Sequence, residues 1–186
     1  MKPLAIDGPR CLRPLDIQDA EAWFTVLEAH RDFLLPLIPT PGRIHTLDDA
    51  VAYMRRAEAD HRSGTAYRFG LWQAGDLQGE VLLFSVRSAD RCAELGYWLA
   101  EDAQGKGLMS WACREIVSFA FGELGLNRLE LRTPTENARS QALARKLGFT
   151  REGTLRQAHR LNGRFPNYQI FGLLASEWRP QGRPGA

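Results

Sequence analysis

Residues 94–109 read ELGYWLAEDAQGKGLM, and this stretch decides the fold. Its first half alternates as a strand does, and a helical pattern begins at Met109. Between them, Gly105 and Gly107 permit a tight turn in which a ligand can approach the backbone closely. Because the first N–H groups of a helix lack internal partners and the helix dipole is positive there, this turn predicts an anion site that suits a pyrophosphate. The alternative is that the two glycines only form a strand-to-helix turn.

Two other phosphate-binding motifs do not fit the same residues. A Walker loop needs a Lys followed by Ser or Thr after its last glycine, whereas Gly107 is followed by Leu108 and Met109. A dinucleotide fingerprint needs a third glycine and a parallel crossover from a first strand. The turn therefore matches neither of these nucleotide-binding classes.

Upstream of this stretch, two helical patterns precede a series of strands. Asp16 opens a helical pattern that ends before Pro36. Thr46 can cap a second helix, with Asp49 at its third position and Gly64 at its end. The strands are expected at residues 11–14, 67–73, 80–86 and 92–100.

Downstream, the period changes to that of a helix over residues 109–120. A strand at 126–133 and a short helix at 138–147 follow, and Gly148 suits the end of that helix. Two more strands are expected around 149–160 and 168–174. Asn162 and Gly163 between them form a strong hairpin signal, because both residues tolerate a left-handed backbone.

The length of 186 residues suits one domain, expected at 1–178, with a flexible Pro- and Gly-containing tail at 179–186. The composition, 44% hydrophobic and 25% charged, is that of a globular protein. No apolar run approaches the roughly 18 residues of a membrane span, and the start lacks the apolar stretch of a signal peptide. We therefore expect a cytoplasmic protein.

Cysteine content and charge restrict the chemistry further. The three cysteines have no C-x-x-C spacing and no partnering His cluster, so we expect neither disulfides nor a metal site. The net charge is +2, but residues 138–186 hold nine basic and two acidic side chains. This asymmetry fits an anionic ligand, or simply a solvated basic face.

Four stretches together resemble the GCN5-related N-acetyltransferase (GNAT) superfamily, and within it the RimJ/RimL branch, which acetylates protein N-termini. They are residues 94–100, residues 104–109, Asn137-x-x-Ser140 continuing to 146–149, and residues 152–163. The family turn has Arg or Gln, two residues, Gly, one residue, and Gly or Ala. Gln104 and Gly107 match this pattern, and Met109 occupies the last small position, as it does in members of the RimL branch.

The resemblance implies an α/β fold with a mixed, mainly antiparallel seven-stranded sheet, helices on both faces and a splayed central strand pair. It also implies transfer of an acetyl group from acetyl-CoA to a primary amine, with no metal. The implied cofactor-binding residues are those of the strand end, the turn and the next helix: Tyr97, Trp98, Leu99, Gln104, Gly105, Lys106, Gly107, Leu108, Met109 and Asn137. For Asn137, a role as helix N-cap is compatible with that contact.

Direct transfer needs a neutral amine, a donor for the oxyanion and a proton for the departing thiolate. Ser140 resembles the hydroxyl that faces the thiol in this branch, so it is the candidate general acid. RimL-like proteins tend to carry an acidic residue where this chain has His159, which is one candidate base because a histidine accepts a proton near neutral pH. Glu94 is the rival base, and an ordinary surface carboxylate is the alternative reading of it.

The expected acceptor is a protein N-terminal amine, with a ribosomal protein suggested by the RimL resemblance. An α-amino group has a pKa of about 7.7 to 8.0, so a weak base suffices, whereas a lysine amine near about 10.4 needs a stronger one. Two alternatives stay open: a small-molecule N-acetyltransferase acting on an amino acid, polyamine or aminoglycoside, and a non-catalytic acyl-CoA-binding module. We expect no nucleic-acid or membrane partner, and a homodimer is possible by analogy with relatives.

Overall fold

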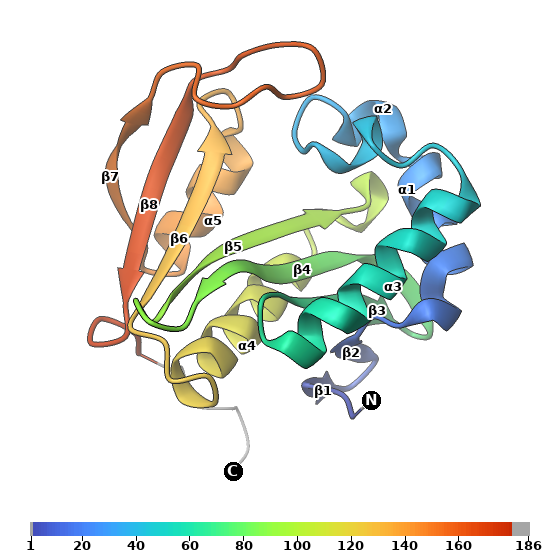
Figure 1. Cartoon of the computed structure of the whole chain (residues 1–186), viewed down its shortest axis with the longest axis horizontal. Helices are drawn as coiled ribbons and strands as arrows, with labels where there is room; N and C mark the ends of the chain where they lie inside the picture. The colour runs from blue at the N-terminus through green and yellow to red at the C-terminus, as the bar shows by residue number, and fades with distance from the viewer. Residues whose placement is uncertain (1, 180–186) are drawn as a thin grey trace.

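The computed structural model describes residues 2–179, which form an eight-stranded sheet with helices packed on it (Figure 1). The strand order is β1-β2-β3-β4-β5-β6-β8-β7, and every neighbouring pair is antiparallel except β5 and β6. The elements are β1 (Ala5–Asp7), β2 (Arg10–Pro14), η1 (Ile17–Asp19), α1 (Ala20–Ala29), α2 (Arg31–Leu34), η2 (Thr40–Gly42), α3 (Leu47–Ser63), β3 (Tyr67–Gln73), β4 (Asp76–Arg87), β5 (Cys92–Leu99), η3 (Glu101–Ala103), α4 (Leu108–Gly122), β6 (Arg128–Pro134), α5 (Ala138–Lys146), β7 (Thr150–Leu155) and β8 (Tyr168–Leu174).

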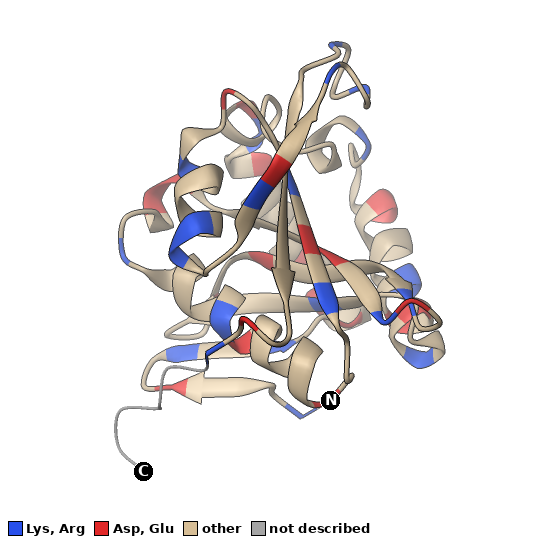
Figure 2. Ribbon diagram, turned by 90° about the vertical axis from the view of Figure 1, so that its left-hand side faces the viewer, with Lys and Arg blue, Asp and Glu red and all other residues tan. Residues whose placement is uncertain are grey.

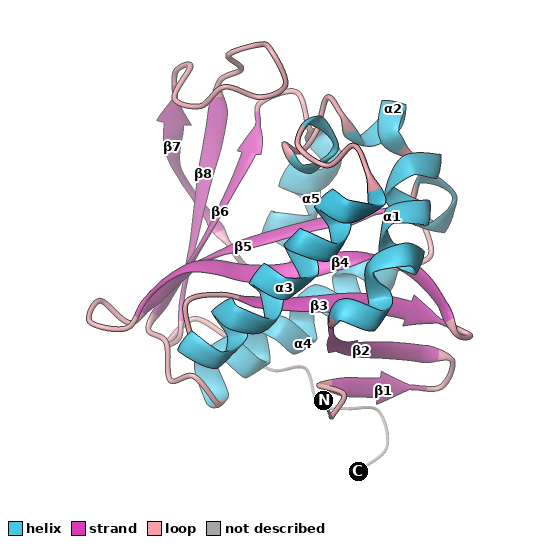
Figure 3. Cartoon of the chain, turned by 45° about the vertical axis from the view of Figure 1, so that its right-hand side comes forward, coloured by secondary structure: helices cyan, strands magenta, loops and turns pink. Residues whose placement is uncertain are grey.

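The predicted fold class is confirmed, because the sheet is mixed, mainly antiparallel and covered by helices on both faces (Figure 3). Helices α4 and α5 cover one face, where Val81 and Leu83 of β4 pack with Ile116 of α4 in the larger apolar core. Helices α1 and α3 cover the other face, where Leu27 and Met54 belong to a second core. Both cores follow from strands whose alternate side chains point to opposite faces.

The predicted number of seven strands is wrong by one, because β1 pairs with β2 through a turn at Gly8. Strand β1 has only three residues, and its central Ile6 is 69% exposed. So short a strand with an exposed apolar residue carries no alternating pattern that the sequence could reveal.

The predicted helix from Asp16 to Pro36 is broken into η1, α1 and α2. Asp16 and Asp19 form a capping box that starts η1, and His30 leaves helical geometry with φ −116° and ψ 18°. The second predicted helix is confirmed as α3, with Thr46 at its N-cap and Gly64 in the left-handed conformation at its end.

The strand predicted around 149–160 is too long, since β7 ends at Leu155. The segment that follows leaves the sheet and reaches toward α2, as the upper part of Figure 1 shows. Within it, Leu161 and Arg164 exchange two backbone hydrogen bonds across Asn162 and Gly163, so the predicted tight turn is confirmed. His159 therefore lies in a loop and not in a strand.

Strands β5 and β6 separate after a short contact, which confirms the predicted splayed pair. Their parallel pairing covers only residues 92–94 of β5 and 128–130 of β6, although β5 continues to Leu99 and β6 to Pro134. Beyond Glu94, the edge of β5 that faces β6 has no strand partner among residues 2–179.

Among the described helices, none is long and apolar enough to cross a membrane. Of the tail predicted as flexible, residues 180–186 lie outside the described part of the chain.

Candidate active site

The turn between β5 and α4 has the geometry of an anion site. Gly105 and Gly107 both have φ +76°, and a Cβ atom at either position would meet no atom within 4 Å. Helix α4 begins at Leu108 without a side-chain cap, whereas the side chains of Thr46 and Asn137 cap α3 and α5. The first N–H groups of α4 are thus left for a ligand, which fits the pyrophosphate of a nucleotide-containing cosubstrate.

The other predicted residues of this turn differ in what they can offer a ligand. Gln104 accepts a hydrogen bond from Arg139 of α5, and Lys106 is exposed. Leu108 and Met109 are buried in the larger core, and Trp98 is buried in the second one. Leu108, Met109 and Trp98 can therefore contact a ligand mainly through their backbone.

Beyond the point where the strands part, Tyr97 points to α5. Its hydroxyl oxygen lies 2.8 Å from Oγ of Ser140, and the Ser140 N–H donates to the side chain of Asn137 at 3.1 Å. Ser140 is 9% exposed, and burial raises the pKa of Tyr97 well above its usual value. The fold thus brings three of the predicted residues, Tyr97, Asn137 and Ser140, together beside the gap.

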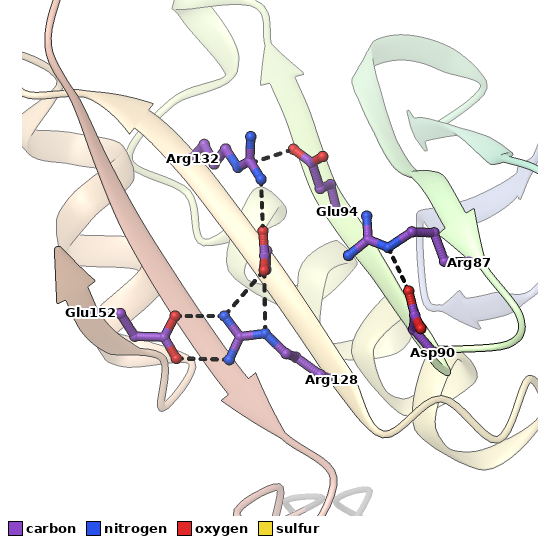
Figure 4. A network of polar contacts seen from close by, with 7 residues as sticks. Arg87, Asp90, Glu94, Arg128, Arg132 and Glu152 are labelled. Carbon is purple, nitrogen blue, oxygen red and sulfur yellow. Dashed lines mark hydrogen bonds and ion pairs between the residues drawn. The ribbon is translucent and has the colours of Figure 1, made fainter. Parts of the chain in front are cut away.

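Glu94 lies on the opposite face of β5. Side chains alternate along a strand, so Glu94 shares the α1–α3 face with Trp98, while Tyr97 occupies the α4–α5 face. Its carboxylate lies 3.5 Å from Nε of Arg132 on β6 (Figure 4), and its side chain is 15% exposed. The gap therefore has a hydroxyl pair on one face and a carboxylate on the other.

His159 is separate from this group. It is exposed in the loop after β7, and its ring packs edge-on against Tyr168 with ring centres 5.4 Å apart. Within the described residues it has no hydrogen bond to Ser140 or Glu94. Basic residues gather on this loop (top of Figure 2), in agreement with the positive charge of the C-terminal quarter.

A buried carboxylate under α1 and α3 escaped the sequence analysis. Glu80 of β4 is 1% exposed and accepts hydrogen bonds from Trp23 at 3.1 Å, Trp98 at 3.0 Å and the hydroxyl of Tyr53 at 2.7 Å. Burial raises its pKa, although these donors and Arg68 oppose the shift. The one available signal was a single acidic residue inside the apolar run of β4.

A set of long-range hydrogen bonds, which we call the clasp, was also missed. Nδ2 of Asn162 donates to the carbonyl oxygens of Leu35 at 2.6 Å and Ile38 at 2.8 Å. Arg164 donates to the carbonyl oxygen of Pro36 and to Glu136, both at 2.6 Å. The clasp joins the loop after β7 to the loop after α2 and to the turn that precedes Asn137.

Comparisons with known proteins agree with this geometry. Residues 10–150 match the family described as acetyltransferase (GNAT) domain, and the chain belongs to this family. The probable N-acetyltransferase YjcK of Bacillus subtilis (strain 168) is 33% identical over 171 residues, which are 88% of this chain and 92% of that protein. The putative ribosomal N-acetyltransferase YdaF of the same organism is 37% identical over 109 residues, which are 59% of this chain and 60% of that protein.

Solved structures show the same fold. RimL, a ribosomal L7/L12 alpha-N-protein acetyltransferase in complex with coenzyme A, matches with a TM-score of 0.89 at 21% identity and covers 93% of this chain and 98% of its own. Mycobacterium smegmatis RimJ in complex with CoA-disulfide matches with a TM-score of 0.85 at 27% identity, over 95% of this chain and 91% of its own. The class predicted from the sequence, an N-acetyltransferase that uses acetyl-CoA, is confirmed.

Proposed function

We propose that this enzyme transfers the acetyl group of acetyl-CoA directly to the α-amino group of a protein N-terminus, with a ribosomal protein as the acceptor. The observation that carries the proposal is the separation of β5 and β6 after Glu94. It places the Tyr97 and Ser140 hydroxyl groups on one face of the gap and the Glu94 carboxylate on the other. A thioester and an amine that approach from opposite faces would meet between them.

In this proposal the cosubstrate lies on the α4–α5 face. The backbone N–H groups of residues 105–109 hold its pyrophosphate, with Gln104 and Lys106 beside it. The pantetheine arm adds to the free edge of β5 at Tyr97, Trp98 and Leu99 as an extra strand, and Asn137 lies alongside it.

The reaction then needs few groups. The amine nitrogen attacks the thioester carbonyl carbon, a C–N bond forms, and the C–S bond breaks. Backbone N–H groups of β5, such as that of Leu99, face the oxyanion. Ser140 gives a proton to the departing thiolate and regains one from solvent, while Tyr97, kept protonated by its raised pKa, hydrogen bonds to Ser140.

The proton lost by the amine passes to Glu94, directly or through water. We prefer Glu94 to His159 because Glu94 lies at the gap itself, whereas His159 lies in the loop after β7. An α-amino group is partly neutral at physiological pH, so a modest base is adequate.

The choice of acceptor rests on the relatives. One curated relative is the uS5-alanine N-acetyltransferase of Escherichia coli (strain K12), 26% identical over 88% of both chains. Another, 29% identical over 61% of this chain, is the ribosomal-protein-serine acetyltransferase of the same organism. A spermidine N(1)-acetyltransferase is also among the relatives, at 33% identity over 54% of both chains. A polyamine is therefore the competing acceptor with which a protein N-terminus must be compared.

The test measures acetyl-CoA consumption, as thiol release, with three kinds of acceptor and with buffer alone as the blank. The acceptors are peptides beginning with alanine or serine, the same peptides with an acetylated N-terminus and an internal lysine, and spermidine. We expect thiol release only with free N-termini, and mass spectrometry should locate the acetyl group on the α-amine. Preferential turnover of spermidine or of the internal lysine would contradict the proposed acceptor.

A further inference from the structure

A line of alternating charges crosses the sheet on the same face as Glu94 (Figure 4). We call it the charged row. It begins on β5 at the gap, crosses β6 and ends on β7, and its members in order are Glu94, Arg132, Glu130, Arg128 and Glu152. The proposed mechanism uses only the first of them.

The two ends of the charged row are held very differently. At the far end, Arg128 donates a hydrogen bond to each carboxylate oxygen of Glu152, at 2.7 and 2.5 Å, and these hydrogen bonds lower the pKa of Glu152. In the middle, Glu130 accepts from Arg132 at 3.0 Å and from Arg128 at 3.2 Å. At the near end, the only ion-pair partner of the Glu94 carboxylate in the described part of the chain is Nε of Arg132, at 3.5 Å. That Nε is itself buried without a hydrogen bond.

A glycine makes the far end possible. Strand β8 lies between β6 and β7, so Arg128 and Glu152 must meet across it. They do so above Gly172, where a Cβ atom would lie 2.3 Å from Oε1 of Glu152 and 2.6 Å from Nη1 of Arg128. Any larger residue at position 172 would therefore push the two charged groups apart.

The charged row holds three carboxylates and two guanidinium groups, so one negative charge is left over. The neighbouring Arg87 of β4 forms an ion pair with Asp90 at 3.2 Å, so it does not neutralise this remaining negative charge. Because the bidentate far end satisfies Glu152 fully and the middle satisfies Glu130 from both sides, the surplus falls on the loosely held Glu94.

We propose that the charged row fixes Glu94 at the gap and leaves it a free negative charge, with which it binds the acceptor as an ammonium ion. This ion loses a first proton to water before its nitrogen attacks, and the second proton passes to Glu94 as the amide forms. Arg132 and Glu152 are then positioning residues. Gly172 lacks a side chain, and this leaves the space in which Arg128 and Glu152 form their ion pair. This inference rests on the proposed function, since it names how the same site selects an amine.

The test measures binding and does not depend on turnover. The probe is a hexapeptide amide beginning with alanine, compared with the same peptide carrying an acetylated N-terminus, each titrated by fluorescence anisotropy onto the protein saturated with CoA. A hydrogen bond to a charged group predicts roughly tenfold tighter binding of the free amine. This preference should shrink as salt is added, because the interaction is ionic.

Four variants separate the parts of the proposal. Glu94→Gln should abolish the preference for the free amine. Gly172→Ala should reduce it severalfold, because the added methyl displaces only the ends of two flexible side chains and the fold is kept. Glu152→Gln removes one of the three carboxylates and leaves the charged row with equal numbers of acidic and basic groups, so it should also reduce the preference. Gly153→Ala on β7 is the matched control, since a Cβ there meets nothing within 4 Å, and should behave as the wild type.

Equal binding of the two peptides by the wild type, or a preference that survives Glu94→Gln, would overturn the inference. An unchanged preference in both Gly172→Ala and Glu152→Gln would equally overturn the role given to the charged row. A failure of the proposed function is recognised separately, as an absence of thiol release with free N-termini. An enzyme that turns over such peptides without a Glu94-dependent preference would keep the proposed function and lose this inference.

Discussion

On the α4–α5 face of the gap, the groups assigned to acetyl-CoA are backbone N–H groups of residues 105–109 and one hydroxyl pair, Tyr97 and Ser140. On the α1–α3 face, the polar groups are side chains gathered from many elements, namely Glu94 with its charged row and Glu80 with its three donors. The clasp, which joins loops, is built from distant residues in the same way. The turn of the proposed cofactor face is thus built by short-range geometry, although Tyr97 and Ser140 are 43 residues apart, and the proposed acceptor face is built by contacts between distant parts of the chain.

This difference determines which substitutions each face tolerates. A backbone site is insensitive to most side-chain changes but is destroyed by bulk where the ligand must touch the main chain. A site made of long-range side-chain contacts loses function in steps, as single contacts are removed.

The largest effect is expected at the cofactor turn. Gly107→Trp places a large side chain where the chain leaves open space, so affinity for acetyl-CoA should fall more than 100-fold by calorimetry, or about 2.7 kcal/mol. Gly8→Trp is the matched control, because Gly8 also has positive φ and open space but lies in the turn between β1 and β2. Similar affinities for both variants would exclude the turn as the binding site.

The next effect concerns the proton given to the thiolate. Ser140→Ala should lower kcat about 100-fold, in the range of general acid–base catalysis, while acetyl-CoA binding persists. Tyr97→Phe should lower kcat less than Ser140→Ala does, because it removes only the hydroxyl group that hydrogen bonds to Ser140. Ser118→Ala on α4 serves as the control serine. A kcat for Ser140→Ala equal to that of this control would remove Ser140 from the mechanism.

A stability effect should appear under the acceptor face. Glu80→Ala leaves two indole N–H groups and one hydroxyl without an acceptor and should cost about 2–3 kcal/mol in urea unfolding, whereas Glu80→Gln keeps an acceptor and should cost less. Because burial raises the pKa of Glu80, its contribution to stability is lost as the pH rises above the ordinary value of 4.5. The wild type should therefore lose more stability than Glu80→Gln as the pH is raised from 4.5. A parallel loss in both proteins would show that Glu80 does not titrate in this range.

The smallest effect is expected at the clasp. Asn162→Ala should raise the acceptor KM a few-fold and leave acetyl-CoA affinity unchanged. Gly42→Ala should have the same effect, because its Cβ would lie 2.0 Å from Oδ1 of Asn162. Since both changes break one contact, the double variant should be no worse than either single one. Additive effects on KM would mean that the two residues act independently.

The sequence predicts several elements of the fold well because their signals are local. The bounds of β3 and β8, the caps of α3 and the glycine turn are all encoded within a few neighbouring residues. The contacts of Glu80 and of the clasp escape prediction because their partners are remote: Glu80 bonds to Trp23, 57 residues away, and Asn162 to Leu35, 127 residues away. The chain leaves the sheet after Leu155, so His159 lies in a loop instead of the predicted strand, and the clasp holds that loop through Asn162 and Arg164.

The most direct test of the central claim, that the turn before α4 and the free edge of β5 form an acetyl-CoA site, is thermal unfolding with acetyl-CoA, free CoA and ATP. A ligand at 100 times its Kd stabilises by about 2.7 kcal/mol, which raises Tm by roughly 5–11 °C in a domain of this size. The account predicts this rise with acetyl-CoA and with CoA, and little change with ATP. No rise, or an equal rise with ATP, would contradict it, because the turn would then be structural or a general anion site.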